Sequence, residues 1–270
     1  MTICCFRTCL PDTTEVFMLN REKTTSTRII ESLKELHLPT MRQLYKVESE
    51  NALKESLSYE EYLLELLERE IEVRRQNRID RFVRESKLPV EKTMDSFERK
   101  RLPRKLDMQL NVLLEGSFLN RKENVLAFGN PGSGKTHLLC AIAHEIIQQG
   151  RRVLFKSCNL LVQELLVAKR DLKLPRVLKQ FSKYELIVID DIGYVQQSRE
   201  EMEVLFTLLA DRYERGSIML TSNLPFSKWE QIFKDPMTTA AAIDRLVHHS
   251  VILELNLPSY RLEESKKEKK

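Results

Sequence analysis

The sequence predicts an α/β protein with a parallel five-stranded sheet flanked by helices and preceded by a small all-α region. From about residue 110 onward, short apolar runs alternate with helix-like segments, whereas residues 20–90 show helical periodicity alone. Because strands that alternate with helices pair in parallel through crossover helices, we expect one sheet covered on both faces. The expected strands are VLAF (125–128), VLFKS (153–157), LIVID (186–190), SIMLTS (217–222) and VILEL (251–255).

The helical region has its own start and stop signals. Apolar residues repeat at helical spacing over residues 26–38, and Pro39 marks the end of that helix. Ser58 and Glu61 then form the pattern of a capping box, in which a hydroxyl residue precedes a glutamate by three positions. The helix that this box opens is expected to stop near Pro89, so residues 20–90 read as a helical hairpin or bundle.

Composition is that of a globular protein without a membrane span. The chain has 270 residues, of which 42% are hydrophobic and 31% are charged. No apolar run reaches the roughly 18 residues that a span requires, and the first residues, MTICCFRTCLP, lack the pattern of a signal peptide. We therefore expect a cytoplasmic protein with no membrane partner.

The cysteines do not form a recognisable metal-binding pattern. None of the five belongs to a CxxC pair or to a Cys/His pattern with zinc spacing. Cys4, Cys5 and Cys9 are close enough in sequence to hold a metal, but a disordered leader over residues 1–17, ahead of a start at Met18, is the simpler interpretation.

Positive charge is concentrated in one segment. The formal net charge is +4, yet residues 74–105 alone hold twelve bases and five acids. Such a concentration favours a polyanionic partner, with double-stranded DNA first, although a solvated basic helix face would give the same pattern. The arginines expected to contact DNA are Arg74, Arg75, Arg78, Arg81 and Arg84.

A phosphate-binding loop lies between the first expected strand and the helix after it. The segment GNPGSGKT (129–136) matches the pattern G-x-x-x-x-G-K-[ST] in full. Its backbone N–H groups can surround phosphate oxygens, Lys135 can reach the β- and γ-phosphates, and the Thr136 hydroxyl can ligate Mg²⁺. We expect ATP and Mg²⁺ as cofactors. The expected nucleotide-binding residues are Gly129, Asn130, Pro131, Gly132, Ser133, Gly134, Lys135, Thr136 and His137.

Polar residues at later strand ends supply the expected catalytic groups. Asp190 ends an apolar strand and is the expected Mg²⁺ partner, through a bound water. Asp191 is expected to polarise the attacking water, with capping of the next turn as the alternative. Asn223 could bond the γ-phosphate or the water. Arg245 either pairs with Asp244 or reaches the γ-phosphate of a neighbouring subunit.

Together these motifs resemble the AAA+ ATPases, in the clade of helicase loaders and transposition helpers. The similarity is most specific to the IstB-like ATP-binding proteins, which assist the transposase of a family of insertion sequences, and it covers residues 18–262. It is carried by LKELHLPTMRQLY (33–45), LSYEEYLLELLEREIEVRRQNR (57–78), FGNPGSGKTHLLCAIAHE (128–145), LIVIDDIGYV (186–195), LTSNLPFSKWEQIF (220–233) and AAIDRLVHHSVILEL (241–255).

The resemblance implies a role for each catalytic candidate. Residues 129–136 become the Walker A loop and Asp190 the Walker B metal ligand. Asp191 stands where most AAA+ proteins have glutamate, which implies hydrolysis that is slow or dependent on a partner. Asn223 corresponds to sensor 1, and Arg245 to an arginine finger acting on a neighbouring subunit.

The resemblance also implies how the chain is divided. We expect a leader over residues 1–17, a basic helical domain for DNA or partner binding over 18–92, an AAA+ domain over 93–262 and a polar tail over 263–270. Little chain follows the last strand, so the usual helical lid should be absent or reduced. Arg261 lies where a sensor 2 arginine would be sought, and Phe97 is either an adenine contact or a core residue.

The expected function is that of an ATP-dependent DNA-binding ATPase that oligomerises on DNA and assists a transposase. A replicative helicase loader would carry much the same motor and is the first alternative. A DNA-bound scaffold that holds ATP with little hydrolysis is the second, because of Asp191. A small-molecule kinase is disfavoured by the acidic pair, by Arg245 and by the basic helical region.

Overall fold

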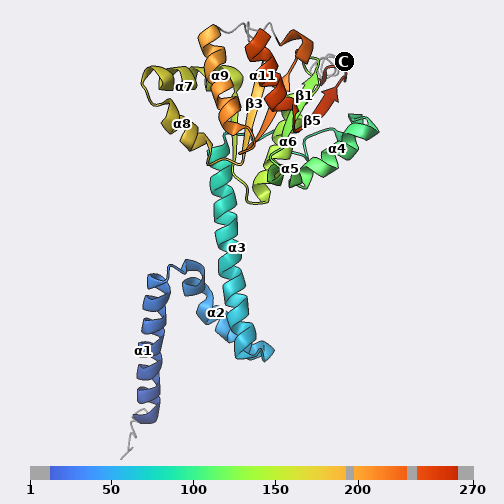
Figure 1. Cartoon of the computed structure of the whole chain (residues 1–270). Helices are drawn as coiled ribbons and strands as arrows, with labels where there is room; N and C mark the ends of the chain where they lie inside the picture. Colours follow the sequence, from blue (N-terminus) through green and yellow to red (C-terminus); the bar gives the residue numbers. More distant parts are fainter. Residues whose placement is uncertain (1–12, 193–197, 230–235, 261–270) are drawn as a thin grey trace, which may run out of the picture. The chain divides into compact units, whose positions relative to one another are not determined.

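The computed structural model describes residues 13–192, 198–229 and 236–260 and divides the chain into two compact units, one up to Asn77 and one from Arg78 (Figure 1). The cysteine cluster near the N-terminus, Arg261 and the expected tail lie outside the described residues. Within them, no helix is long and apolar enough to cross a membrane.

The first unit is helical, as expected, but it contains one helix more than the sequence suggested. It comprises α1 (Thr13–Glu35), α2 (Pro39–Glu55) and the start of α3 (Tyr59–Ser86). Pro39 follows the end of α1 and is itself the first residue of α2, because proline at that position needs no N–H partner. The expected capping box is confirmed, since Ser58 N–H donates to Glu61 Oε2 at 2.7 Å and Glu61 N–H to Ser58 Oγ at 3.2 Å.

A buried carboxylate fixes the start of α2 against α3. Glu70, only 3% exposed, accepts the N–H groups of Thr40 and Met41 at 2.8 and 3.0 Å. Burial alone would raise the pKa of Glu70, but the N–H of Met41, Arg74 at 2.8 Å and the N–H of Thr40 together lower it. Glu70 thus satisfies helix-end donors that have no partner within α2.

The second unit contains the predicted parallel sheet. All five expected strands are confirmed and pair in parallel, and the structure gives their order as β2-β3-β4-β1-β5. Their bounds are β1 (Asn124–Gly129), β2 (Val153–Ser157), β3 (Leu186–Ile192), β4 (Ser217–Ser222) and β5 (Ser250–Leu255).

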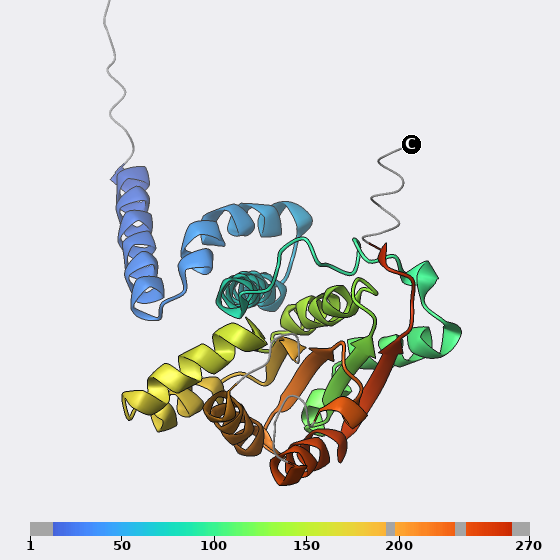
Figure 2. The same ribbon diagram turned by 90° about the horizontal axis from the view of Figure 1, so that it is seen from above.

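Helices cover both faces of this sheet (Figure 2). One face packs against α4 (Arg104–Leu114), α5 (Ser117–Asn120), α6 (Lys135–Gln148) and the last turns of α3. The other packs against α7 (Cys158–Arg170), α8 (Leu174–Phe181), α9 (Arg199–Arg212) and α11 (Pro236–Val247). Short 3-10 turns occur at Arg99–Arg101 and Phe226–Lys228. Strands β1, β3 and β4 lie inside the sheet and are buried over most of their length, as strands covered on both faces must be.

A buried arginine binds backbone carbonyls at the end of the sheet where the strands begin. Arg212, at the end of α9, is 3% exposed and its guanidinium donates to four backbone carbonyls. These belong to Phe181 at 3.2 Å, Tyr184 at 2.7 Å, Glu185 at 3.0 Å and Ser217 at 3.0 Å. Burial lowers the pKa of Arg212 to about 10, so the group stays charged at neutral pH.

Replacing Arg212 should therefore destabilise the second unit strongly. Arg212→Met leaves four carbonyls without their donor, two of them in buried hydrogen bonds, and we expect the free energy of unfolding to fall by about 3 kcal/mol. Urea titration followed by circular dichroism measures the loss. Arg215→Met is the matched control, because that side chain is 77% exposed and its loss should change stability by less than about 0.5 kcal/mol. Equal losses in the two variants would contradict a structural role for Arg212.

Candidate nucleotide-binding site

The expected phosphate-binding loop connects β1 to α6 at the edge where the strands end. Gly134 is the N-cap of α6 with φ of 93°, a left-handed value that favours glycine. A Cβ built on Gly129 would lie 2.2 Å from the carbonyl oxygen of Leu255 on β5, so no larger residue fits there. The loop therefore needs these glycines both for its curl and for its contact with the neighbouring strand.

Lys135 lies inside the curve of this loop. The residue is 6% exposed, and its Nζ atom donates to the carbonyl oxygens of Gly129 at 2.8 Å and Asn130 at 2.9 Å. The positive end of the α6 dipole lies at the same place, because Lys135 is the first residue of that helix. Both positive groups thus face the space enclosed by the loop, where an anion is favoured.

Asp190 and Thr136 are in direct contact, in an arrangement that suits a metal ion. The Thr136 hydroxyl, in the first turn of α6, donates to Asp190 Oδ1 on β3 at 2.8 Å. A hydroxyl and a carboxylate are hard oxygen donors of the kind that Mg²⁺ takes up beside nucleotide phosphates. The pair therefore fits a Mg²⁺ ion, with one residue from the loop helix and one from the sheet.

Asp191 adopts an unusual backbone conformation next to Asp190. Pairing between β3 and β4 joins Ile189 to Leu220 and then Ile192 to Ser222, so two residues of β3 oppose one residue of β4. This is a β-bulge, and Asp191 within it has φ of 60°. Aspartate tolerates the left-handed region better than most residues, since its short side chain can bond locally. Asp191 is exposed, in contrast to the buried strand that leads to it.

Asn223 lies at the same edge of the sheet. Phe128, one residue before the loop, pairs with Ser222, so Asn223 follows β4 at the level of Gly129. Its Oδ1 atom is buried and accepts no hydrogen bond from the described residues. An amide oxygen left without a partner at this place is consistent with a ligand contact, because buried polar atoms are normally paired.

Arg245 lies at the opposite end of the sheet, where the strands begin. Two residues after it α11 ends, and β5 then begins at Ser250, which pairs with Asn124 at the start of β1. A six-residue strand spans roughly 17 Å, so the guanidinium is out of reach of the loop in its own subunit. Arg245 is held there by the Phe206 ring, 4.9 Å from its Cζ atom, and by the carbonyl of Ala241 at 3.3 Å.

A small hollow adjoins the phosphate-binding loop. Its volume is about 40 Å³, and it is lined by Ser96, Phe97, Glu98, Arg101, Ser133, His137, Leu257 and Tyr260. The Phe97 and His137 rings meet edge to face with centroids 5.3 Å apart, and the buried Ser133 Oγ has no partner among the described residues. Phe97 and His137 thus stand where a group extending from the phosphates would enter.

The segment after β5 closes one side of this hollow. The Tyr260 N–H donates to the carbonyl oxygen of Gly132 at 3.0 Å, which places the segment against the loop itself. The Arg101 guanidinium lies 5.3 Å from the centroid of the Tyr260 ring and donates to the carbonyl of Pro258 at 3.1 Å. Segments before β1 and after β5 therefore both lie beside the loop.

The expected DNA-contacting arginines do not share one role in the structure. Arg74 bonds the buried Glu70, and its guanidinium also contacts the carbonyl of His37, so it holds the first unit together. The other four lie exposed along α3, from Arg75 to Arg84. Between residues 24 and 77 acids outnumber bases by eleven to eight, so the positive charge belongs to the last turns of α3 and beyond.

A second group of exposed bases lies at the end of α7 and along α8. It consists of Arg170, Lys173, Arg176, Lys179 and Lys183. Within α8, Leu174, Val177, Leu178 and Phe181 face the core, which turns the bases outward. These residues were not among the expected DNA contacts, although their amphipathic spacing was a usable signal.

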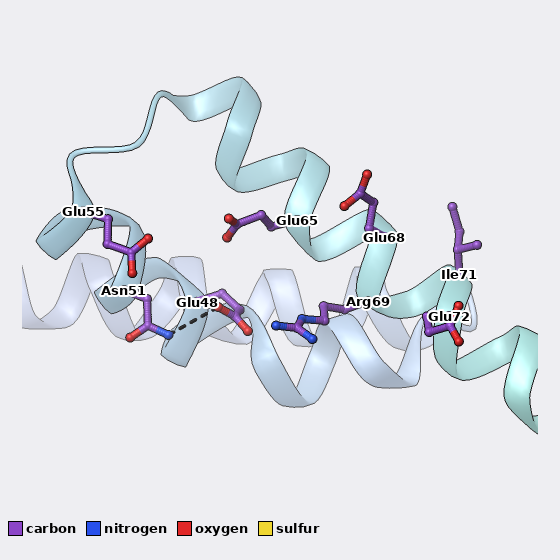
Figure 3. A pocket seen from close by; sticks show the side chains of 8 residues that line it. All are labelled: Glu48, Asn51, Glu55, Glu65, Glu68, Arg69, Ile71 and Glu72. Atoms are coloured by element: carbon purple, nitrogen blue, oxygen red, sulfur yellow. Dashed lines mark hydrogen bonds between the residues drawn. The ribbon is translucent and has the colours of Figure 1, made fainter.

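An acidic groove of about 750 Å³ lies in the first unit between α2 and α3 (Figure 3). It is lined by Glu48, Asn51, Glu55, Glu65, Glu68, Arg69, Ile71 and Glu72. Its five carboxylates face one guanidinium, so the groove repels phosphates. Neither the phosphates of a nucleotide nor those of DNA are favoured there.

Comparison with known proteins identifies the family. A family model described as IstB-like ATP binding protein matches residues 31–268. The chain belongs to this family. An insertion sequence ATP-binding protein of Sinorhizobium fredii is 42% identical over 230 residues, covering 85% of this chain and 77% of the relative. Another, from Geobacillus stearothermophilus, is 39% identical over 239 residues, covering 88% and 95%.

Solved structures show the same fold in more distant proteins. AMPPCP-bound DnaA from Aquifex aeolicus has a TM-score of 0.53 at 18% identity, over 68% of this chain and 56% of that one. The DnaC helicase loader has a TM-score of 0.53 at 17% identity, over 61% and 97%. The predicted P-loop AAA+ fold and the predicted membership of the IstB-like family are both confirmed.

The bulge at Asp191 should restrict which acid can stand there. Asp191→Glu places a longer residue in a left-handed conformation, so we expect a loss of about 1 kcal/mol in stability and no gain in ATP hydrolysis. Asp191→Gly is the control, because glycine accepts φ of 60° freely and should retain the stability while losing the carboxylate. Denaturant titration and steady-state hydrolysis measure the two effects. A glutamate variant as stable as the wild type and faster would contradict this restriction.

Proposed function

We propose that this chain is the ATPase of an insertion sequence: it binds ATP with Mg²⁺, assembles into an oligomer on double-stranded DNA, and assists the cognate transposase. The observation that carries the proposal is the contact of Thr136 with Asp190 beside Lys135, which supplies a metal site and a phosphate site together. Membership of the IstB-like family and the names of the insertion sequence relatives support the biological setting.

Different residues of this chain bind the phosphates and orient the attacking water. Bound ATP with its Mg²⁺ supplies the phosphoanhydride bond and a divalent charge. Lys135 exchanges its two carbonyl partners for phosphate oxygens, and the N–H groups at the start of α6 hold the same phosphates. Asp191 orients the attacking water, and the amide of Asn223 steadies the water or the γ-phosphate from the neighbouring strand.

The base of ATP is assigned to the hollow beside the loop. Phe97 borders it from the segment before β1, His137 from the first turn of α6, and Tyr260 from the segment after β5. A volume of about 40 Å³ is close to that of one water molecule, so a purine must displace these side chains to enter. Binding of ATP is therefore linked to movement of the segments that border the hollow.

Hydrolysis requires a second subunit in this proposal. Arg245 is separated from its own loop by the length of β1, and the Phe206 ring holds it at the far edge. A neighbouring subunit that docks its strand-end edge there would receive the guanidinium at its γ-phosphate. A short Asp191 and a shared site together imply slow hydrolysis outside the assembly.

DNA binding is assigned to the exposed bases of the second unit. Arg78, Arg81 and Arg84 lie on α3, and the α8 group adds a further basic surface. Neutralisation of phosphates by such side chains gives affinity that tolerates sequence and falls with salt. This suits capture of target DNA better than reading of one site. The acidic groove of the first unit is assigned to contacts with another protein.

A helicase loader is the alternative partner assignment. The likeness to DnaC shows the fold and no more at 17% identity. The relatives at 39–42% identity are named as insertion sequence proteins, which favours the transposase. Pull-down of the full chain with the purified transposase, with a replicative helicase in parallel, separates the two assignments.

Loss of Lys135 should uncouple DNA binding from ATP. In Lys135→Ala we expect hydrolysis to fall by at least about 100-fold, because a preorganised charge on the transferred phosphate is lost. The stimulation of DNA binding by ATP should disappear with it. Mobility shifts with and without ATP at several salt concentrations, together with steady-state hydrolysis, measure both effects. Lys228→Ala, an exposed lysine outside the proposed surfaces, is the control. Equal DNA binding by the wild type with and without ATP would refute the coupling.

Complementation between subunits tests the role of Arg245. Arg245→Ala should reduce hydrolysis by about 1000-fold or more, as for other arginine fingers. A mixture of Arg245→Ala with Lys135→Ala should regain activity, because some interfaces pair an intact loop with an intact arginine. The specific activity of the wild type should rise with protein concentration. Wild-type hydrolysis by Arg245→Ala, or a specific activity independent of concentration, would rule out the shared site.

A further inference from the structure

The bulge in β3 makes one residue of β4 the neighbour of both acids. Ile189 pairs with Leu220 and Ile192 with Ser222, so Asp190 and Asp191 together oppose Thr221. Thr221 is completely buried, although its side chain carries a hydroxyl. A buried hydroxyl needs partners, and the position of Thr221 opposite the bulge supplies them.

The Thr221 hydroxyl contacts both residues of the bulge. It donates to Asp190 Oδ1 at 2.6 Å, and it accepts the N–H of Asp191 at 2.8 Å. The first bond fixes the carboxylate, and the second satisfies the N–H of the residue with φ of 60°. A single hydroxyl thus uses its donor and its acceptor to connect the expected metal ligand with the expected catalytic acid.

These contacts determine which oxygen of Asp190 is left for a metal. The hydroxyls of Thr221 and Thr136 both donate to Oδ1, at 2.6 and 2.8 Å. Oδ2 accepts no hydrogen bond from the residues that the structure describes. The carboxylate is therefore oriented with one oxygen bound by the protein and the other available to a metal-bound water.

We propose that Thr221 is a positioning residue for the acidic pair, which orients Asp190 toward Mg²⁺ and holds Asp191 in its left-handed conformation. This inference rests on the proposed ATPase function. Thr221 touches neither nucleotide nor metal and acts through its neighbours. Asn223, which follows this strand and was expected to contact the γ-phosphate or the water, makes no contact of this kind among the described residues.

The chemistry of the hydroxyl makes the proposal specific. Valine has nearly the shape of threonine but neither donates nor accepts, so Thr221→Val removes both bonds with little change in packing. Serine retains the hydroxyl and loses only a methyl group. A residue needed merely to fill the core would tolerate valine better than serine, whereas a positioning residue requires the reverse.

The test compares these two variants in full-length protein. In Thr221→Val we expect the Mg²⁺ concentration for half-maximal hydrolysis to rise by about tenfold and kcat to fall by about tenfold, as for other losses of a group that orients a metal ligand. The KM for ATP should change little. Thr221→Ser should return all three values to near those of the wild type. Binding of Mn²⁺ in the presence of a non-hydrolysable ATP analogue, followed by electron paramagnetic resonance, gives the same comparison without turnover.

A second readout needs no nucleotide. Amide hydrogen exchange of the peptide containing Asp191 should be faster in Thr221→Val and restored in Thr221→Ser, because the N–H loses and regains its acceptor. If Thr221→Val fails to fold, Thr221→Ala takes its place with the same expectations.

Three results would overturn the proposal. They are an unchanged Mg²⁺ requirement in Thr221→Val, a serine variant as impaired as the valine variant, and unchanged exchange at Asp191. A wild type that binds no ATP would instead refute the proposed function, and the exchange experiment would still decide whether Thr221 holds the bulge.

Discussion

One carboxylate oxygen, Oδ1 of Asp190, joins the three elements on which the candidate site depends. It accepts a hydroxyl from α6 through Thr136 and a hydroxyl from β4 through Thr221, while Asp190 itself belongs to β3. The phosphate-binding loop and two central strands are thereby held in one arrangement. Because hydrogen bonds to a charged group are stronger than those between neutral groups, this is an economical way to preorganise a metal site before any ligand arrives.

The residues at the two ends of the strands have different roles, and the length of the strands separates the two groups. At the edge where strands begin, Arg212 replaces missing donors for four carbonyls and Arg245 rests on Phe206. At the other edge the polar residues of the loop, the bulge and β4 gather. This division follows from parallel pairing, since all carboxyl ends of the strands then meet at the same edge.

The sequence was sufficient wherever a signal was local. Five strands and the start of α3 followed from apolar runs and from the Ser58–Glu61 pattern, and the loop followed from its glycines with Lys135 and Thr136. The order and register of the strands depend on residues far apart in the sequence, so these could not be predicted although the parallel pairing was. The bulge that places Asp190 and Asp191 opposite Thr221 exists only through the register of β3 with β4, and for this reason the contacts of Thr221 with the acidic pair could not be predicted from the sequence. Pro39 shows a different limit, because it served both as the stop of one helix and as the start of the next.

Helix α3 is exposed on every side over residues 71–78, so packing cannot be what maintains it there. Ion pairs along the helix supply the alternative, at Glu70–Arg74 and Glu72–Arg75. In addition, Glu60 and Glu61 stand in the first turn and Arg84 in the last, in the order that complements the helix macrodipole. The same order makes the helix a long electric dipole in its own right. An approaching polyanion would be turned by this field before contact, toward the arginine end and away from the glutamate end. Under the proposed function, DNA would thus be oriented before it touches the protein, with no base being read.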